Sequence, residues 1–275
     1  MITASVVLYK TPREDVDSIL KSFAPGADRR LFLLDNSPEY DGSFDDVRDM
    51  PFVEYIFNGT NLGYGRANNI GIRKAVEQGS DYHIVMNPDL SFEPDVPDRL
   101  AAFADADPSV VYILPEIVNE SGTVQHLCKL LPTPADLIFR RFFPDKGIVR
   151  KNNERYVLAA FGYDRIINPP CLSGCFMFMR TKTLREHALY FDERFFMYCE
   201  DFDLIRRLHR VGKTLYYPGV RIVHRQARAS YTDRGMLKAH IVSACRYFNK
   251  YGWLIDPERK RMNERILREL ETDPE

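Results

Sequence analysis

The sequence lacks an excess of charge of either sign. Its 38 Lys and Arg residues nearly balance its 39 Asp and Glu residues, and the formal net charge is −1. Proteins that bind nucleic acid over a broad surface carry a basic excess or a basic stripe. We therefore expect no nucleic-acid partner.

Cysteine is also scarce, and its number is odd. The five cysteines lie mostly in apolar stretches, which fits reduced thiols in a cytosol better than a disulfide framework. Cys171 and Cys175 stand close together, but no second Cys pair or neighbouring His completes a zinc site.

Long hydrophobic runs are absent as well. The longest, around Cys171–Met179, contains Ser and Gly and is about half the length of the roughly 18–20 residues that span a membrane. The first residues, MITASVVLYKT, have no basic leader and predict a strand, not a signal peptide. These absences predict a cytoplasmic protein, soluble or peripheral at the inner face of the cell membrane.

What the sequence does contain is an alternation of apolar segments and amphipathic segments. Its 275 residues suit one large α/β domain, with or without an appendage. Helices are predicted at Pro12–Phe23, Tyr64–Gln78 and Pro94–Ala106, between buried strands. The predicted strands are Ile2–Tyr9, Leu31–Leu34, Phe52–Phe57, Asp81–Met86, Val110–Leu114 and Cys171–Arg180, followed by Lys213–Tyr217 and Val220–Val223 around a Pro218-Gly219 turn.

Carboxylates follow two of these strands directly, where open α/β sheets bind ligands. Asp35 is either a contact to a base or ribose or the first residue of an Asx-turn. Asp89, in Asn87-Pro88-Asp89, is either a ligand for a hard cation on a diphosphate or a turn residue. His224 closes the last predicted strand, as a structural histidine or as a further ligand.

A run of glycines and amides, Asn58–Asn69, opens the predicted helix at Tyr64. Gly-rich backbone at a helix N-terminus can approach phosphate or ribose oxygens and donate N–H groups to them. The run matches neither the P-loop nor the dinucleotide pattern, so the generic phosphate signal is weak.

An acidic cluster emerges from an apolar stretch at Phe191–Leu204. Apolar residues recur at helical spacing from Leu204 to Val211, which puts Glu200 and Asp201 at a helix N-terminus. Carboxylates there cap free N–H groups, or one of them acts as a general base aimed into a cleft.

Two segments have weaker patterns. Residues 115–170 hold a basic-aromatic stretch, Phe139–Lys151, which is a packed loop, a lid or a membrane-facing surface. The tail is helical and basic around Arg259-Lys260-Arg261 and Arg265, and it either packs on the domain or lies on anionic lipid. One apolar face is predicted for its first helix: Leu237, Ile241, Ala244, Cys245 and Phe248.

In their order and spacing, the motifs resemble family 2 glycosyltransferases, of the rhamnosyltransferase-like bacterial group that builds O-antigen and other surface glycans. The resemblance covers roughly residues 2–230. It rests on Asp35-Asn36-Ser37, Asn61–Asn69, Asn87-Pro88-Asp89, Ser173-Gly174 and Phe191–Asp203.

The resemblance implies a GT-A fold, which is α/β with a Rossmann-like, mostly parallel central sheet flanked by helices, here with a C-terminal helical appendage. It implies a catalytic domain at 1–232, with a nucleotide-binding half at 1–114, an insertion at 115–170 and an acceptor and catalytic half at 171–232. Residues 233–275 would form the tail.

The resemblance also implies an inverting enzyme, with Asp201 as the base, Glu200 beside it, and Mg²⁺ or Mn²⁺ held by Asp89 and His224. Asn87 stands where the family's metal motif has its first Asp, which puts the strength of metal binding in doubt. The nucleotide-sugar site would comprise Tyr9, Asp35, Asn36, Asn61, Gly63, Arg66, Asn87, Ser173 and Gly174.

The leading expectation is transfer of rhamnose from dTDP-rhamnose to a glycan or lipid-linked acceptor, by a protein that could form a homodimer. A galactofuranosyl or other hexosyl transferase that uses a UDP-sugar is the first alternative, and an inactive glycan-binding relative is the second. A sugar nucleotidyltransferase is disfavoured, because Tyr9–Arg13 follows the first strand where that class carries a Gly-rich basic loop.

Overall fold

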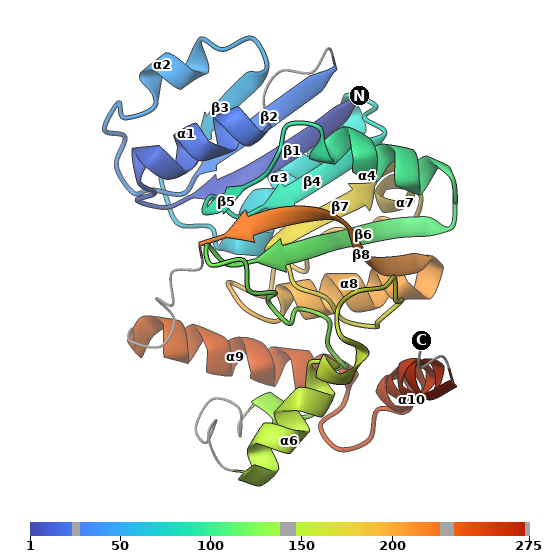
Figure 1. The fold of residues 1–275 in the computed structure, drawn as a ribbon. Helices are drawn as coiled ribbons and strands as arrows, with labels where there is room; N and C mark the ends of the chain where they lie inside the picture. Colours follow the sequence, from blue (N-terminus) through green and yellow to red (C-terminus); the bar gives the residue numbers. More distant parts are fainter. Residues whose placement is uncertain (24–27, 138–146, 226–233, 273–275) are drawn as a thin grey trace.

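The computed structural model describes residues 1–23, 28–137, 147–225 and 234–272, and its centre is a mixed β-sheet covered by helices (Figure 1). Within these ranges the sheet has eight strands in the order β3-β2-β1-β4-β7-β6-β8-β5. Strands β3, β2, β1 and β4 are parallel, β6 and β8 are parallel, and β7 and β5 run antiparallel to their neighbours. The strands are β1 Ile2–Leu8, β2 Arg29–Asp35, β3 Val53–Phe57, β4 Tyr82–Met86, β5 Leu90–Ser91, β6 Val110–Val118, β7 Phe176–Arg180 and β8 Lys213–His224.

The helices follow from amphipathic segments between the strands. Val16 and Ile19 of α1 join Val6 of β1 in the main core, whereas Ser5 on the other face of β1 donates a 2.8 Å hydrogen bond to Asn68 of α3. Helices α1 and α3 therefore cover opposite faces of the parallel strands. The helices are α1 Arg13–Ser22, α2 Asp45–Arg48, α3 Tyr64–Glu77, α4 Val96–Asp105, α6 Gly147–Tyr156, the 3₁₀ helix η1 Ala159–Phe161, α7 Thr181–Glu186, α8 Glu200–Val211, α9 Arg234–Tyr251 and α10 Pro257–Thr272.

Two strand predictions are wrong in detail. β8 is one strand from Lys213 to His224, because the chain stays paired in parallel with β6 on both sides of Pro218-Gly219 and only a shift of register marks the site. The strand predicted at Cys171–Arg180 begins at Phe176, and the small residues before it form a loop that reaches Asp201 at the start of α8.

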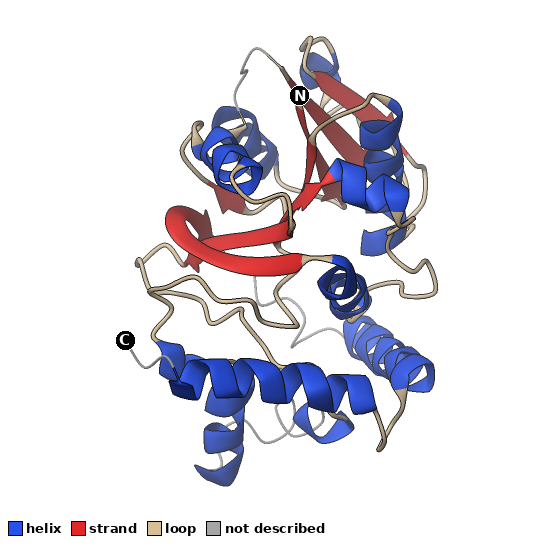
Figure 2. Cartoon of the chain, turned by 90° about the vertical axis from the view of Figure 1, so that its right-hand side faces the viewer, coloured by secondary structure: helices blue, strands red, loops and turns tan. Residues whose placement is uncertain are grey.

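The C-terminal helices lie below the sheet, on the side of α8 (Figures 1 and 2). A second small core joins Phe195 and Cys199, just before α8, to Tyr247 and Phe248 of α9. Arg206 of α8 is buried and makes two 2.7 Å hydrogen bonds to Asp256 and one of 2.8 Å to Glu258, at the start of α10. The tail is thus anchored to the helix that carries Asp201.

The predicted apolar face of α9 is wrong in one respect. Phe248 is buried as predicted and Ala244 packs against the same core, but Ile241 is 49% exposed. The buried side of the helix also includes Ser243 and Tyr247, which the predicted apolar stripe does not contain. Among the described residues, no helix combines the length and apolar character needed to cross a membrane.

Part of the predicted basic-aromatic stretch, residues 138–146, lies outside the described residues. Its last two cations, Arg150 and Lys151, are exposed on α6.

Candidate active site

The carboxyl end of β2 carries Asp35 in a buried, fully hydrogen-bonded position. One oxygen accepts a 2.8 Å bond from the Ser37 amide, and the other accepts the hydroxyl of Tyr55. The Asx-turn interpretation is therefore confirmed. The contact to a base or ribose stays a prediction.

Asn36 ties the loops around this strand end together. Its Nδ2 donates to the Gly63 carbonyl at 3.2 Å and to Asn61 Oδ1 at 3.4 Å, and its Oδ1 accepts from Asn58 at 3.0 Å. Asn61 also accepts the Gly63 amide at 3.0 Å. The predicted nucleotide-site amides thus shape the Gly-rich loop through bonds within the protein.

Gly63 lets this loop contact the acidic stretch. Its φ is +82°, and a Cβ there would lie 2.2 Å from the carbonyl oxygen of Phe196. The same carbonyl accepts the Tyr64 amide at 3.0 Å. Asn69, in the next turn of α3, exchanges two hydrogen bonds of 2.8 and 2.9 Å with the backbone of Phe191. Two of the recognised motifs are therefore in direct contact.

The side chains at the rim of this region remain accessible. Tyr9 follows β1 and is 48% exposed. Next to it, the Lys10 amide donates to Ser37 Oγ at 3.1 Å, which joins the β1 and β2 strand ends. Arg66 is exposed at the first turn of α3, 3.6 Å from Glu193.

Asp201 lies in the first turn of α8, against the loop before β7. Its Oδ2 accepts the Gly174 amide at 3.2 Å, and its Oδ1 accepts the Phe202 amide at 2.9 Å. A Cβ on Gly174 would lie 2.8 Å from the Cβ of Asp201, so this approach requires glycine. Ser173, the other predicted residue of this loop, accepts the Tyr112 hydroxyl through its carbonyl at 2.8 Å.

The turn into α8 is held in an unusual conformation. Tyr198 and Cys199 both have positive φ, 69° and 64°. Such angles cost non-glycine residues free energy and persist only where surrounding contacts enforce them. These two backbone angles set the direction in which the chain enters α8, and with it the positions of Glu200 and Asp201.

Glu200 is buried, and within the described part of the chain its Oε2 has no hydrogen-bond partner. Burial, and then the charge of Asp201, raise the pKa of Glu200 to about 8. Burial also raises the pKa of Asp201, but Lys129 and the Phe202 and Gly174 amides oppose it. Lys129 and the two amides favour the charged form of Asp201, and no neighbouring residue among those described does so for Glu200, so we expect a proton shared by this pair to reside on Glu200.

The predicted metal ligands, far apart in sequence, come together. β5 pairs antiparallel with the end of β8, with Leu90 opposite His224. This places His224 Nε2 3.4 Å from Asp89 Oδ1. Burial lowers the pKa of His224, but hydrogen bonds to Asp89 and Cys175 outweigh it and raise the pKa to about 10.

Asp89 and His224 suit a cation that takes its other ligands from a diphosphate and water, as Mg²⁺ does at phosphate sites. Such a cation would have to displace the proton through which His224 bonds to Asp89, because only neutral imidazole is a metal ligand. No group of three or more His, Cys, Asp or Glu side chains in the described ranges forms a complete metal site by itself. Asn87 lies on the same turn, and its amide donates to the Cys175 carbonyl at 2.9 Å.

Sequence reasoning missed two residues of this region. Tyr64 donates its hydroxyl to the Gly174 carbonyl at 2.9 Å and so links the Gly-rich loop to the loop at Asp201. Gln125 lies 3.1 Å from His224 Nδ1 and donates to the His224 carbonyl at 3.0 Å. Tyr64 stood within a recognised motif, whereas nothing in the irregular segment around Gln125 pointed to it.

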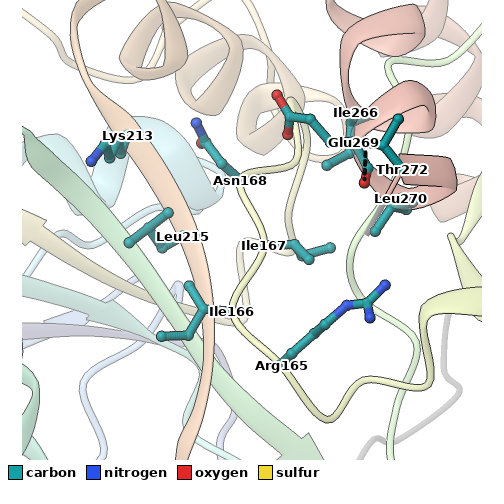
Figure 3. Close-up of a pocket in the computed structure, with 10 residues that line it drawn as sticks. All are labelled: Arg165, Ile166, Ile167, Asn168, Lys213, Leu215, Ile266, Glu269, Leu270 and Thr272. Atoms are coloured by element: carbon teal, nitrogen blue, oxygen red, sulfur yellow. Dashed lines mark hydrogen bonds between the residues drawn. The ribbon is translucent and has the colours of Figure 1, made fainter. Parts of the chain in front are cut away.

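A separate hollow of about 500 Å³ opens between α10 and the start of β8 (Figure 3). Its lining includes the apolar residues Ile167, Leu215 and Ile266 and the charged residues Arg165 and Glu269. It lies at the start of β8, whereas His224 closes the other end of the strand, so it is distinct from the carboxylate site.

Comparison with known proteins defines the class. The model of the family described as Glycosyl transferase family 2 matches residues 10–187, and the chain belongs to this family. That match ends before Asp201, so the catalytic-helix assignment rests on the geometry and on the motif.

Individual relatives share about a quarter of their residues with this chain. An N-acetylglucosaminyl-diphospho-decaprenol L-rhamnosyltransferase of Mycobacterium tuberculosis is 26% identical over 83% of this chain and 77% of its own length. The low-salt glycan biosynthesis hexosyltransferase Agl10 of Haloferax volcanii is 26% identical over 74% of this chain and 60% of its own. Rhamnosyltransferase WbbL of Escherichia coli K12 is 26% identical over 62% and 64%.

Solved structures identify the fold. S. aureus TarS 1-349 in complex with UDP-GlcNAc has a TM-score of 0.58 at 14% identity, over 99% of this chain and 73% of that one. GalNAc-T7 with UDP, GalNAc and Mn²⁺ has a TM-score of 0.58 at 15% identity, over 82% and 43%. The predicted GT-A fold is confirmed, and the protein is a family 2 glycosyltransferase.

Proposed function

We propose that the protein is an inverting rhamnosyltransferase that transfers rhamnose from dTDP-rhamnose to a glycan or lipid-linked acceptor in bacterial surface polysaccharide synthesis. The observation that carries this proposal is the similarity, over most of the chain, to two rhamnosyltransferases from different bacteria. One of these relatives is named for a lipid-linked acceptor, and on that basis we place the protein at the inner face of the membrane.

In this proposal Asp201 is the general base. Its carboxylate takes the proton of the acceptor hydroxyl while that oxygen bonds to the anomeric carbon, and the bond from this carbon to the diphosphate breaks on the opposite face. The amides of Gly174 and Phe202 hold the carboxylate ionised and in one orientation. Glu200, buried and protonated, keeps a second negative charge out of the site.

Asp89 and His224 would hold Mg²⁺ or Mn²⁺, which neutralises charge on the leaving diphosphate when bound. The two side chains lie 3.4 Å apart at the end of the sheet where the Gly-rich loop also stands. The loop at Asn61–Arg66, with Tyr9, Asp35 and Asn36, would surround the nucleotide. Asn87, Ser173 and Gly174 would lie toward the sugar.

Residues 1–114 would thus supply the nucleotide side, and 171–232 the catalytic side, with acceptor contacts from 115–170. A hexosyl transferase that uses a UDP-sugar is the second candidate function, because one relative is named a hexosyltransferase and the fold neighbours hold UDP-sugars.

The first test is a thermal-shift titration of the purified protein with dTDP, UDP, GDP and CDP, each with and without Mn²⁺. We expect dTDP to raise the melting temperature most, and the cation to increase that effect. Selective stabilisation by UDP would favour the hexosyl alternative. Failure of all four nucleotides would favour an inactive glycan-binding relative.

A substitution of Asp89 tests the metal assignment separately. Asp89→Ala should weaken nucleotide binding in the presence of Mn²⁺ and leave metal-free binding nearly unchanged, because a cation ligand is lost but the nucleotide loops remain. Identical titration curves for Asp89→Ala and the wild type with the cation present would contradict the assignment.

A further inference from the structure

One face of α9 combines exposed apolar side chains with cations and contains no acidic residue. Lys238, Val242, Arg246 and Asn249 are exposed along this face, and Ile241 flanks it. At the end of the helix the chain turns through Trp253, Leu254 and Ile255, which are 43%, 89% and 82% exposed. We call this set the α9 face.

Its composition is unusual for an exposed helix of this protein. Residues 234–251 contain four Arg and Lys residues and neither Asp nor Glu, although the whole chain is balanced in charge. On α10, by contrast, Lys260, Arg265 and Arg268 each lie within 4 Å of a glutamate one turn away. Of the four cations of α9, Lys250 is paired with Asp192 and Asp203. The positive charge of this face therefore lies on Lys238 and Arg246, which are exposed and have no acidic side chain within 4 Å among the described residues.

We propose that the α9 face binds an anionic lipid surface, with the helix in the plane of the interface and Trp253, Leu254 and Ile255 inserted. Interfacial helices bury an apolar face with Trp and Leu at the headgroup boundary, while Lys and Arg contact anionic headgroups. Leu254 and Ile255 are adjacent on a turn, where both can enter the acyl boundary without a change in the fold. Trp253 is fixed by a 2.8 Å hydrogen bond from its indole N–H to Asn249.

The opposite side of the same helix holds the segment that leads to Asp201. Ser243 donates to the Met197 carbonyl at 2.7 Å, and Lys250 Nζ lies 2.8 Å from Asp192 and also contacts Asp203 of α8. Tyr247 and Phe248 pack with Phe195 and Cys199. A helix lying on the membrane would thus hold the segment that leads to Asp201 against its inner side, one helix away from the lipid surface.

This inference rests on the proposed function only for the nature of the acceptor, and binding to lipid can be measured without any transfer. The chain has a single tryptophan, so Trp253 reports on this surface alone. We expect vesicles of phosphatidylcholine with phosphatidylglycerol to shift Trp253 emission to the blue and to sediment the protein. Vesicles of pure phosphatidylcholine should do neither.

Variants locate the binding surface. Leu254→Ser/Ile255→Ser should weaken vesicle binding at least about tenfold, since both side chains lose their transfer into the interface. Lys238→Glu should weaken it more than about fivefold. Two matched controls on other surfaces, Ile166→Ser and Arg261→Glu, remove an exposed apolar residue and reverse an exposed cation, and both should bind as the wild type does.

Several results would overturn the proposal. Sedimentation without a change in Trp253 emission would mean that another surface binds lipid, and no sedimentation would mean that none does. A blue shift that depends on protein concentration without vesicles would mean that a second copy of the chain covers the α9 face. Transfer to a water-soluble acceptor should be equal in the wild type and the Leu254→Ser/Ile255→Ser variant, so loss of vesicle binding with that activity intact separates this proposal from the proposed function.

Discussion

The position of Asp201 depends on a residue with no side chain. Gly174 brings its amide to 3.2 Å from the carboxylate, and any Cβ at this position would meet the Cβ of Asp201 at 2.8 Å. The carboxylate is thereby held by backbone donors, which favour its charged form. A glycine in the loop before β7, 27 residues earlier in the chain, thus favours the charged form of an aspartate in the first turn of α8.

Replacing the proposed base tests its role directly. Asp201→Asn should lower kcat by about 10²–10⁴-fold, the usual contribution of a general base, because the amide cannot accept the acceptor proton. Nucleotide binding, measured by the same thermal-shift titration, should stay near the wild-type level. A variant that retained substantial transfer activity would rule out this role for Asp201.

Glu200 provides a test by pH. In the folded protein its pKa is raised from the ordinary value of 4.5 to about 8, so between these values the folded state holds a proton that the unfolded chain has released. The contribution of Glu200 to stability is therefore lost as the pH rises through this window.

Glu200→Gln cannot ionise, so its melting temperature relative to the wild type should rise from about pH 5 to about pH 8.5. Thermal melts across that range measure the difference. A difference in melting temperature that does not vary with pH would show that Glu200 is not held protonated by the fold. Transfer activity also distinguishes the two carboxylates. Glu200→Gln should retain most of this activity at neutral pH, whereas Asp201→Asn should lose it.

At the scale of helices and strands, much was predictable. The alternation of apolar and amphipathic segments located the parallel strands and α3, and the apolar spacing after Asp201 located α8. The turn predicted at Pro218-Gly219 is wrong, because pairing with β6 continues on both sides of these residues and outweighs their local preference for a turn. Periodicity likewise indicated only part of the buried side of α9, since that side also includes Ser243 and Tyr247, which contact a loop distant in sequence.

The approach of Asp89 to His224 was only in part predictable. Each residue stood at a strand end, but the pairing of the two-residue strand β5 with β8 has no signal in the sequence. The Asn68-Asn69 pair, part of the motif on which the family resemblance rests, bonds to Ser5 and to the Phe191 backbone. Such roles depend on partners more than 60 positions away in the chain.

The contact between α8 and α10 gives a prediction at this scale. Arg206 and Asp256 have side-chain exposures of 1% and 2%. Arg206→Met should lower the free energy of unfolding by about 3–5 kcal/mol, because Asp256 is left as a buried charge without its partner. Chemical denaturation measures this loss.

Two further variants control that measurement. Arg206→Met/Asp256→Leu should recover a large part of the stability, because neither charge then remains in the interior. Arg268→Met, on the exposed side of α10, should change stability by no more than about 0.5 kcal/mol. Equal losses for Arg206→Met and Arg268→Met would show that burial of the pair contributes nothing.

For the molecule as a whole, the C-terminal helices are integrated with α8 and the segment before it. The tail predicted at 233–275 supplies Tyr247 and Phe248 to the second core, Lys250 to Asp203, and Asp256 to Arg206. A chain that ends at residue 233 should therefore lose cooperative thermal unfolding, beyond any loss of lipid binding. Near-UV circular dichroism and a melting curve test this, and a cooperative melt close to that of the full-length protein would contradict it.

The bond between Arg206 and Asp256 also affects how the protein is made. Domains begin to fold from the N-terminus while the ribosome is still extending the chain. The sheet and the Gly-rich loop can form early, but α8 receives its buried counter-ions only when residues 256 and 258 have emerged. The packing around α8, the helix that carries Asp201, is therefore completed only after this later segment has been made.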